Sequence, residues 1–235
     1  MSTHVSPARV RVHPDIAARY PQARIAVVYA FEVKNGLSDE RGGAQLREAC
    51  QQAASTLGSD KPQSYPHIQA WRGVYQSFGA KPSTYLCSAE ALIQRALKDG
   101  PPCINRLVDF YNAISIAHLL PIGGEDLDCL QGDLVLQIAD GSQTFDVPHG
   151  GGAESALVPA GEVVWADAAG VTCRRWNWRQ GRRTRLTEES RNAYFVIEAL
   201  SPPCAETDFD HAVQAIAGGL AAHFGAGRVV VDRLK

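Results

Sequence analysis

Several features common in secreted, membrane and metal-binding proteins are missing from this sequence. No stretch of about twenty apolar residues occurs, so no segment is typical of a membrane-spanning helix. Residues 1–11 carry charges that no apolar run follows, unlike a secretory signal. The six cysteines include no Cys-x-x-Cys pair and the seven histidines show no metal-binding spacing. We therefore expect a cytoplasmic protein with reduced thiols and with no membrane contact, metal or cofactor.

Standard catalytic motifs are missing as well. There is no Gly-x-Ser-x-Gly elbow, no phosphate-binding loop that ends in Gly-Lys-Ser or Gly-Lys-Thr, and no Gly-x-Gly-x-x-Gly after a strand. Glycines at 150–152 could cradle an anion, but they follow Pro148 and His149 between predicted strands, and we favour a flexible connection. The common serine-hydrolase, nucleotide-binding and dinucleotide-binding signatures are thus excluded.

Composition and charge are those of an ordinary globular chain, with one local exception. Of the 235 residues, 45% are hydrophobic and 20% are charged. A net charge of −2 argues against non-specific nucleic-acid binding, and we expect no DNA partner. Charge is uneven, however, because seven arginines lie between Arg174 and Arg191, against only Glu188 and Glu189. This cluster predicts one patch that faces an anion.

Hydrophobic periodicity predicts an α+β (mixed α/β) fold, in which helices flank a central mixed β-sheet. One hairpin is predicted around Asp140 and Gly141, and another around Ala169 and Gly170. No linker or internal repeat divides the chain, so residues 1–235 are expected to form a single domain. The predicted strands are 9–13, 25–31, 134–138, 144–147, 163–166, 171–173, 192–200 and 229–231, and the predicted helices are 14–20, 38–56, 67–78, one from 88, 104–120 and 207–223.

The predicted helix 104–120 is apolar on most of its circumference and should be central. Asn105, Asp109 and Asn112 nevertheless form one polar stripe at helical spacing. Because buried polar groups need partners or line a cavity, two interpretations stay open. The stripe is either a network that caps the helix and tethers loops, or the lining of a pocket.

Two later segments mix charge with other chemistry. Three carboxylates at 125–128 could bind Mg²⁺ or raise one another's pKa, although a capped turn is the interpretation we favour. Residues 173–180 combine guanidinium groups, indoles and amides, a mixture that suits an unpaired nucleic-acid end. Alternatively, this segment packs its tryptophans inward and pairs its arginines with carboxylates such as Glu125 and Asp126.

Two parts of the sequence, 103–133 and 173–200, resemble the editing, tRNA-binding B3/B4 domain of the phenylalanyl-tRNA synthetase beta subunit. The first part resembles the domain as it is inserted in the bacterial subunit, and the second resembles a freestanding branch of the family. The resemblance covers roughly residues 65–200 and implies the fold of that editing domain. The segments that carry it are 103–112, 121–128, 132–133, 173–180, 187–190 and 192–200.

In the synthetase this domain hydrolyses tyrosine wrongly attached to tRNA-Phe, so the resemblance implies an ester hydrolase that corrects mischarged tRNA in trans. Asn112 matches an asparagine of the editing pocket, Glu198 matches the glutamate that helps to recognise the substrate, and Arg106 matches a pocket arginine. Asn112 and Glu198 are therefore the expected catalytic residues. Tyr111 replaces a threonine of the family, and Gly123 replaces a histidine that could position water. These departures predict a substrate other than tyrosine.

The first hypothesis is thus an aminoacyl-tRNA deacylase that binds the aminoacylated 3′ end of a tRNA. A non-catalytic tRNA-binding module and a small-molecule amino-acid-binding protein are the alternatives. The sequence leaves the amino acid, the tRNA and the oligomeric state open. The expected substrate-binding residues are Asn105, Arg106, Tyr111, Gly123 and Arg174, and the expected tRNA-binding residues are Arg175, Trp176, Arg179, Arg182, Arg183 and Arg185.

Overall fold

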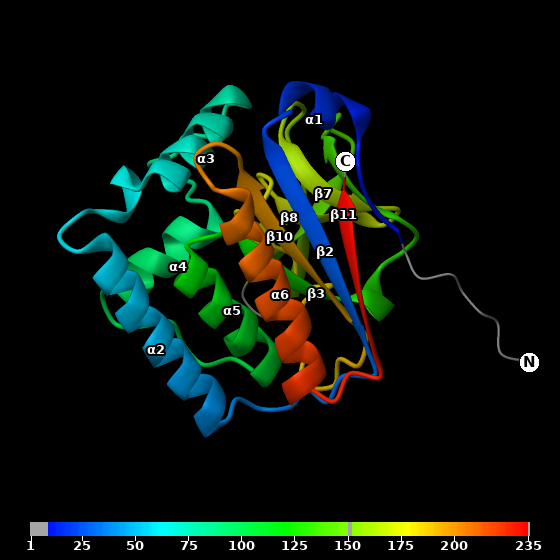
Figure 1. The fold of residues 1–235 in the computed structure, drawn as a ribbon. Helices are drawn as coiled ribbons and strands as arrows, with labels where there is room; N and C mark the ends of the chain where they lie inside the picture. Colours follow the sequence, from blue (N-terminus) through cyan, green and yellow to red (C-terminus); the bar gives the residue numbers. More distant parts are fainter. Residues whose placement is uncertain (1–8, 150–151, 235) are drawn as a thin grey trace, which may run out of the picture.

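The computed structural model describes residues 9–149 and 152–234. In this part of the chain the strands form one seven-stranded mixed sheet and one four-stranded antiparallel sheet, and most helices lie together while the helix at 14–19 lies apart from them (Figure 1). The predicted α+β class with a mixed sheet and flanking helices is confirmed. The strands divide into two sheets instead of one.

The four-stranded sheet has the order β11-β2-β10-β3 and carries the site described below. Its central strands are apolar at most positions, which suits strands covered on both faces. β10 is buried at every position, and Tyr194 of β10 lies opposite both Tyr29 of β2 and Glu125 of β3. The strands are β2 (Ala23–Phe31), β3 (Ile122–Asp126), β10 (Ala193–Leu200) and β11 (Arg228–Leu234).

The seven-stranded sheet has the order β1-β4-β7-β8-β5-β6, and β9 pairs with β8. The predicted hairpin around Ala169 and Gly170 is confirmed, because β7 and β8 pair there. Its members are β1 (Val10–Val12), β4 (Leu134–Ile138), β5 (Thr144–His149), β6 (Gly152–Leu157), β7 (Val163–Asp167), β8 (Gly170–Arg174) and β9 (Arg179–Gln180).

The hairpin predicted around Asp140 and Gly141 does not form. β4 pairs with β1 and β7, whereas β5 pairs with β6 and β8. The backbone after β4 is already bonded to the start of β7, since the Ala139 N–H donates to Glu162 O over 2.8 Å. Residues 150–151 of the glycine-rich segment lie outside the described residues.

The helices bury one apolar face each and divide between the two faces of the four-stranded sheet. α5 and α6 lie against one face, and α2 packs on α5 (Figure 1). No helix in the described ranges is long and apolar enough to cross a membrane. The helices are α1 (Pro14–Arg19), α2 (Glu40–Leu57), α3 (Pro66–Ser77), α4 (Ser88–Ala96), α5 (Arg106–His118) and α6 (Glu206–His223), with short 3-10 turns at η1 (Pro62–Ser64) and η2 (Leu127–Cys129).

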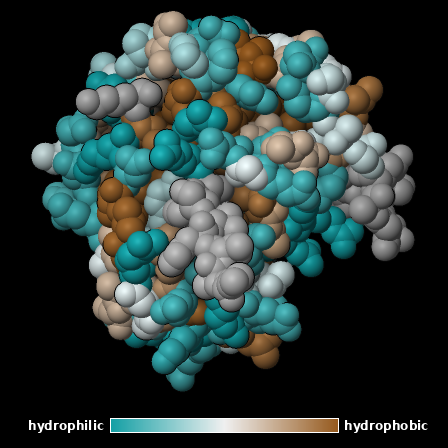
Figure 2. All heavy atoms as spheres, turned by 90° about the vertical axis from the view of Figure 1, so that its right-hand side faces the viewer, coloured by the Kyte–Doolittle hydropathy of each residue, from teal (hydrophilic) through white to brown (hydrophobic). Residues whose placement is uncertain are grey.

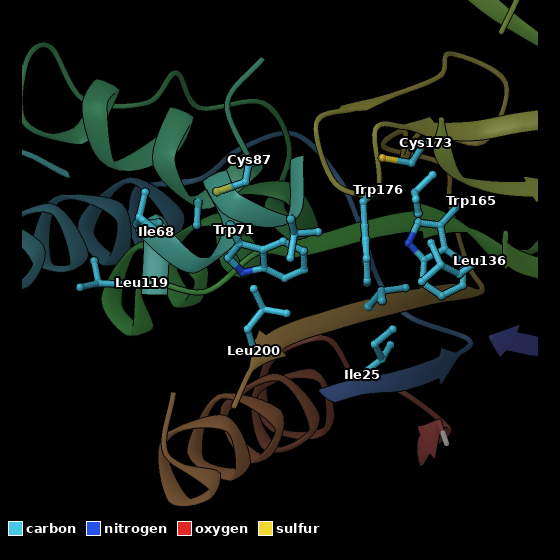
Figure 3. Packing of buried hydrophobic residues seen from close by; sticks show 14 of the residues in the cluster. Ile25, Ile68, Trp71, Cys87, Leu119, Leu136, Trp165, Cys173, Trp176 and Leu200 are labelled. Atoms are coloured by element: carbon cyan, nitrogen blue, oxygen red, sulfur yellow. The ribbon is translucent and has the colours of Figure 1, made fainter. Parts of the chain in front are cut away.

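Strand alternation directs side chains of β10 to two different cores. Phe195 and Ile197 point toward α5 and α6, while Tyr194 and Val196 point toward the seven-stranded sheet and α3. Figure 3 shows Trp71, Trp176 and Trp165 in a row on this second side. Hydrophilic residues cover most of the outer face seen in Figure 2, where hydrophobic ones lie in small groups.

Candidate functional site

A pocket of about 240 Å³ lies where the second face of β10 meets the seven-stranded sheet and helices α4 and α5. This volume is below the ~300–1,000 Å³ typical of pockets for drug-sized ligands, so it suits a molecule of amino-acid size. The walls are largely aromatic, two carboxylates line the interior, and two arginines lie at the exposed margin. The aromatic residues are Tyr111, Trp165, Trp176, Trp178 and Tyr194, the acids are Glu125 and Glu198, and the arginines are Arg95 and Arg179.

Glu198 of β10 is held inside the pocket wall by neutral donors. Its Oε1 accepts the indole N–H groups of Trp165 at 3.1 Å and Trp176 at 2.9 Å, and its Oε2 accepts the Asn177 amide at 2.8 Å. The side chain is 3% exposed. Burial raises the pKa of Glu198 from 4.5 to about 7, against the opposing effect of the three donors. The result is a rigid carboxylate with no cation beside it.

The donors to Glu198 are themselves fixed by packing. The Tyr75 hydroxyl donates to Asn177 Oδ1 over 2.8 Å, which orients the amide toward the carboxylate. The Trp176 ring packs edge-on against Trp71 and Tyr20, with centroids 5.2 and 5.0 Å away. Such preorganised donors hold the carboxylate in one position before any ligand arrives.

Glu125 of β3 is the second pocket carboxylate, and sequence analysis did not place it in a pocket. The Tyr194 hydroxyl donates to Glu125 Oε2, while Glu125 Oε1 has no hydrogen-bond partner in the described structure. Burial raises the pKa of Glu125 from 4.5 to about 7, although the hydroxyls of Tyr194, Thr184 and Thr172 and the charge of Arg183 oppose this. The pair of glycines directly before Glu125 was the available signal, because they mark a strand that other groups approach closely.

Gly123 lies on the pocket side of β3, whereas Gly124 faces the core formed with α5 and α6. A Cβ on Gly124 would lie 2.7 Å from the Phe195 ring, so a larger residue would push β3 away from its neighbour. A Cβ on Gly123 would meet the Gln180 amide at 2.9 Å, so Gln180 occupies the space in front of Gly123. Both expected residues on this side, Gly123 and Tyr111, line the pocket.

The polar residues of α5 have two different roles: one lines the pocket, and the others cap the helix or bind a loop. Asn112 lines the pocket. Asn105 instead caps the helix, with its Oδ1 accepting Val108 N–H at 3.0 Å and its Nδ2 donating to Leu186 O at 3.2 Å. Asp109 accepts the Ile104 N–H at 2.8 Å. Asn105, expected to bind substrate, therefore lies outside the pocket because its amide is needed at the helix start.

Arg106 also lies outside the pocket. Its Nε is 3.0 Å from Asp39 Oδ2, its Nη1 donates to Lys34 O over 2.9 Å, and its guanidinium lies 5.2 Å from the Phe224 ring centroid. These contacts join the start of α5 to α2 and to the end of α6. The position in the first turn of the helix points this side chain away from β10.

Arg174 and Arg175, which were expected to bind substrate and tRNA, are paired inside the protein. Arg174 makes a two-pronged contact with Glu162 at 2.8 and 2.9 Å, and Arg175 Nη2 lies 3.4 Å from the same carboxylate. Arg175 also stacks over Tyr85 and Trp178, with 3.7 and 4.5 Å to the ring centroids. The expected pairing of arginines with carboxylates is thus present, but with Glu162.

The remaining expected tRNA-binding residues occupy different environments. Trp176 is fully buried and offers no face on which a base could stack. Arg183 pairs with the buried Asp167 at 2.7 Å. Arg179 and Arg185 are exposed, and Arg179 alone of the six lies at the pocket margin with a free edge. The backbone N–H of Arg182 donates to Asp146 Oδ2 over 2.7 Å.

Asp126 and Asp128 of the acidic segment adopt the capped turn favoured from the sequence, whereas Glu125 lies in β3. Asp126 Oδ1 accepts the Asp128 N–H at 2.9 Å at the start of η2. In the described ranges no group of three or more His, Cys, Asp or Glu side chains is arranged to hold a metal ion.

Fold and pocket together define an α+β domain that encloses a small, acidic and aromatic-walled site. A family model described as the B3/4 domain matches residues 70–214. The chain belongs to the B3/4 domain family, which confirms the family expected from the sequence.

Comparison with solved structures gives a distant likeness. An N-terminal fragment of the phenylalanyl-tRNA synthetase beta subunit from Pyrococcus horikoshii is similar with a TM-score of 0.47 and 13% identity, over 97% of this chain and 54% of that chain. The present chain thus spans about half the length of that fragment. No curated protein matches the sequence.

Proposed function

We propose that this protein hydrolyses the ester bond of a mischarged aminoacyl-tRNA. The observation that carries the proposal is Glu198, a buried carboxylate in an amino-acid-sized pocket whose hydrogen bonds come only from neutral groups. A carboxylate without a cation, surrounded by aromatic rings, favours a ligand that brings its own positive charge. The α-ammonium of an aminoacyl ester supplies one.

The reaction asks little of the protein beyond positioning. A water oxygen attacks the ester carbonyl, the bond to the ribose oxygen breaks, and that oxygen takes up a proton, giving free amino acid and tRNA. An aminoacyl ester is already reactive, so a held water and a donor for the developing oxyanion suffice. The Asn112 amide, which lines the pocket from α5, is the side chain we assign to this role.

Two exposed arginines at the pocket margin support a ligand with phosphate groups. Arg95 of α4 and Arg179 of β9 both line the pocket, and neither forms an ion pair within the described ranges. Guanidinium groups bind phosphates through paired N–H donors. On this proposal they hold the backbone of the tRNA 3′ end while the amino acid enters the pocket.

The test is deacylation of a panel of tRNAs, each charged with correct or incorrect amino acids. We expect selective release of one mischarged species, reduced at least about 100-fold by Asn112→Ala, as for the loss of one oxyanion donor. Glu198→Gln should also reduce release, because the α-ammonium loses its counterion. Gln214→Ala on α6 is a matched control, because this exposed amide lies on the helix that covers the opposite face of the sheet. Absence of release from every species would reject the hydrolase.

One observation favours a second candidate, a protein that binds a free amino acid. The pocket is complete within this chain, whereas Arg174, Arg175 and Arg183 are taken up by internal ion pairs. Such a protein would bind amino acids without releasing any from tRNA and would show no salt-dependent affinity for tRNA.

A further inference from the structure

The two pocket carboxylates lie on the same face of the four-stranded sheet. Tyr194, Val196 and Glu198 alternate toward the pocket along β10. Glu125 is directly opposite Tyr194 and therefore points to the same side. Glu198 follows Tyr194 by four residue steps along the strand, which places the two acids roughly 13 Å apart along the backbone. They stand at opposite ends of one floor.

The floor between the acids is low. Val196 lies there, and its opposite neighbour on β3 is Gly123, which has no side chain. The Gln180 amide lies in front of Gly123, and Cys173 also lines the pocket. A ligand that reaches both carboxylates must therefore be extended, with a polar group at each end and a middle that packs on Val196 beside the Gln180 amide.

The charges of Glu125 and Glu198 indicate which polar groups the two ends of the ligand carry. None of the ion pairs in the described ranges involves Glu125 or Glu198. One α-ammonium neutralises one carboxylate and leaves the other. Glu125 Oε1 has no partner at hydrogen-bond geometry in the described ranges, although the Thr172 and Thr184 hydroxyls lie near this carboxylate and the residue is 3% exposed. A buried acceptor without a well-placed donor is unfavourable, so a charged donor on the ligand is favoured there.

We propose that the amino acid taken by this pocket carries a second amine on its side chain, which Glu125 binds while Glu198 holds the α-ammonium. This inference rests on the proposed function only in taking the amino acid to be esterified to tRNA. Recognition of the second amine does not depend on that. The substrate class is then a basic amino acid with a short aliphatic chain, of the lysine or ornithine type.

Calorimetric titration of the whole protein with free amino-acid amides tests the proposal without tRNA or hydrolysis. L-Lysinamide or L-ornithinamide should bind at least about tenfold more tightly than L-norleucinamide, which has the aliphatic chain but no side-chain amine. Glu125→Gln should remove this preference and leave the affinity for norleucinamide within about threefold. Equal affinity of wild type for the amides, or no binding of any, overturns the proposal.

A second variant covers the case in which Glu125→Gln does not fold. Glu125→Asp keeps the charge but withdraws it by one methylene, so the preferred amine should move to a side chain that is one methylene longer. An unchanged optimum also overturns the proposal. If the amides bind as expected while no charged tRNA is deacylated, the hydrolase fails and the ligand class stands.

Discussion

Two glutamates on either side of one short segment show opposite ways to bury a carboxylate. Residues 174–177 send Arg174 and Arg175 to Glu162, and Trp176 and Asn177 to Glu198. Both carboxylates are nearly inaccessible, at 6% and 3% exposed. The first meets two guanidinium groups, and the second meets only neutral N–H donors.

On the proposed function, this difference separates a structural site from a binding site. The charge of Glu162 is neutralised within the protein by two guanidinium groups. The Glu198 cluster satisfies hydrogen bonds but leaves a negative charge in an aromatic pocket. Three predictions test whether this division is real.

The largest effect is expected from Glu162→Ala. Removing this carboxylate leaves Arg174 and Arg175 buried without a counterion, which should lower the free energy of unfolding by about 3–5 kcal/mol. Glu198→Gln is the comparison, because the Asn177 amide and Tyr75 hydroxyl can turn to match a neutral partner, and its loss should stay below about 1 kcal/mol at pH 8. Urea denaturation measures both. If Glu198→Gln lowered the free energy of unfolding more than Glu162→Ala, Glu198 and not Glu162 would be the structural carboxylate.

For each pocket carboxyl group, the pH dependence of stability should show a somewhat smaller effect. Burial raises the pKa of Glu198 and of Glu125 from 4.5 to about 7. Below pH 4.5 both the folded and unfolded states are protonated; between pH 4.5 and 7 only the folded state keeps the protons. Stability should therefore fall as pH rises through this window, by roughly 3 kcal/mol for each group, and level off above it.

Denaturation between pH 4 and 8 measures this slope, and Glu198→Gln and Glu125→Gln should each remove about half of it. A slope that survives in the double variant would mean that other groups cause it.

The smallest effect on stability is expected from Arg179→Ala. This side chain is exposed at the pocket margin, so the free energy of unfolding should change by less than about 0.5 kcal/mol. Its loss should weaken tRNA binding and reduce the salt slope by about one unit. Arg183→Ala should instead lower the free energy of unfolding and leave tRNA binding unchanged, because Arg183 pairs with the buried Asp167. Equal tRNA affinity in Arg179→Ala and wild type would remove this arginine from the binding surface.

Much of the frame could be predicted from the sequence because its signals are local. The apolar run at 25–31 and the long amphipathic segment at 104–120 correspond to β2 and α5. The pocket positions of Asn112 and Glu198 came from the resemblance to the B3/B4 family. Their assigned catalytic roles stay predictions.

What could not be predicted depends on contacts between distant residues. β3 contains two glycines and two acids, a composition typical of a turn, and only pairing with the buried β10 makes it a strand. Glu125 was therefore assigned to a capped turn. Likewise, the charges of Arg174 and Arg183 predicted an exposed patch, because sequence spacing does not show that Glu162 and Asp167 lie beside them.

The strand pairing of β2 limits when the four-stranded sheet can fold during synthesis. β2 ends at Phe31, yet its two neighbours in the sheet, β10 and β11, begin at Ala193 and Arg228. On the ribosome β2 must wait, unpaired and strongly apolar, while more than 160 further residues are synthesised. Such non-local pairing slows folding and leaves an aggregation-prone strand exposed. The chain should therefore engage a chaperone during synthesis, and the pocket, whose floor is β10, completes only in the last stage.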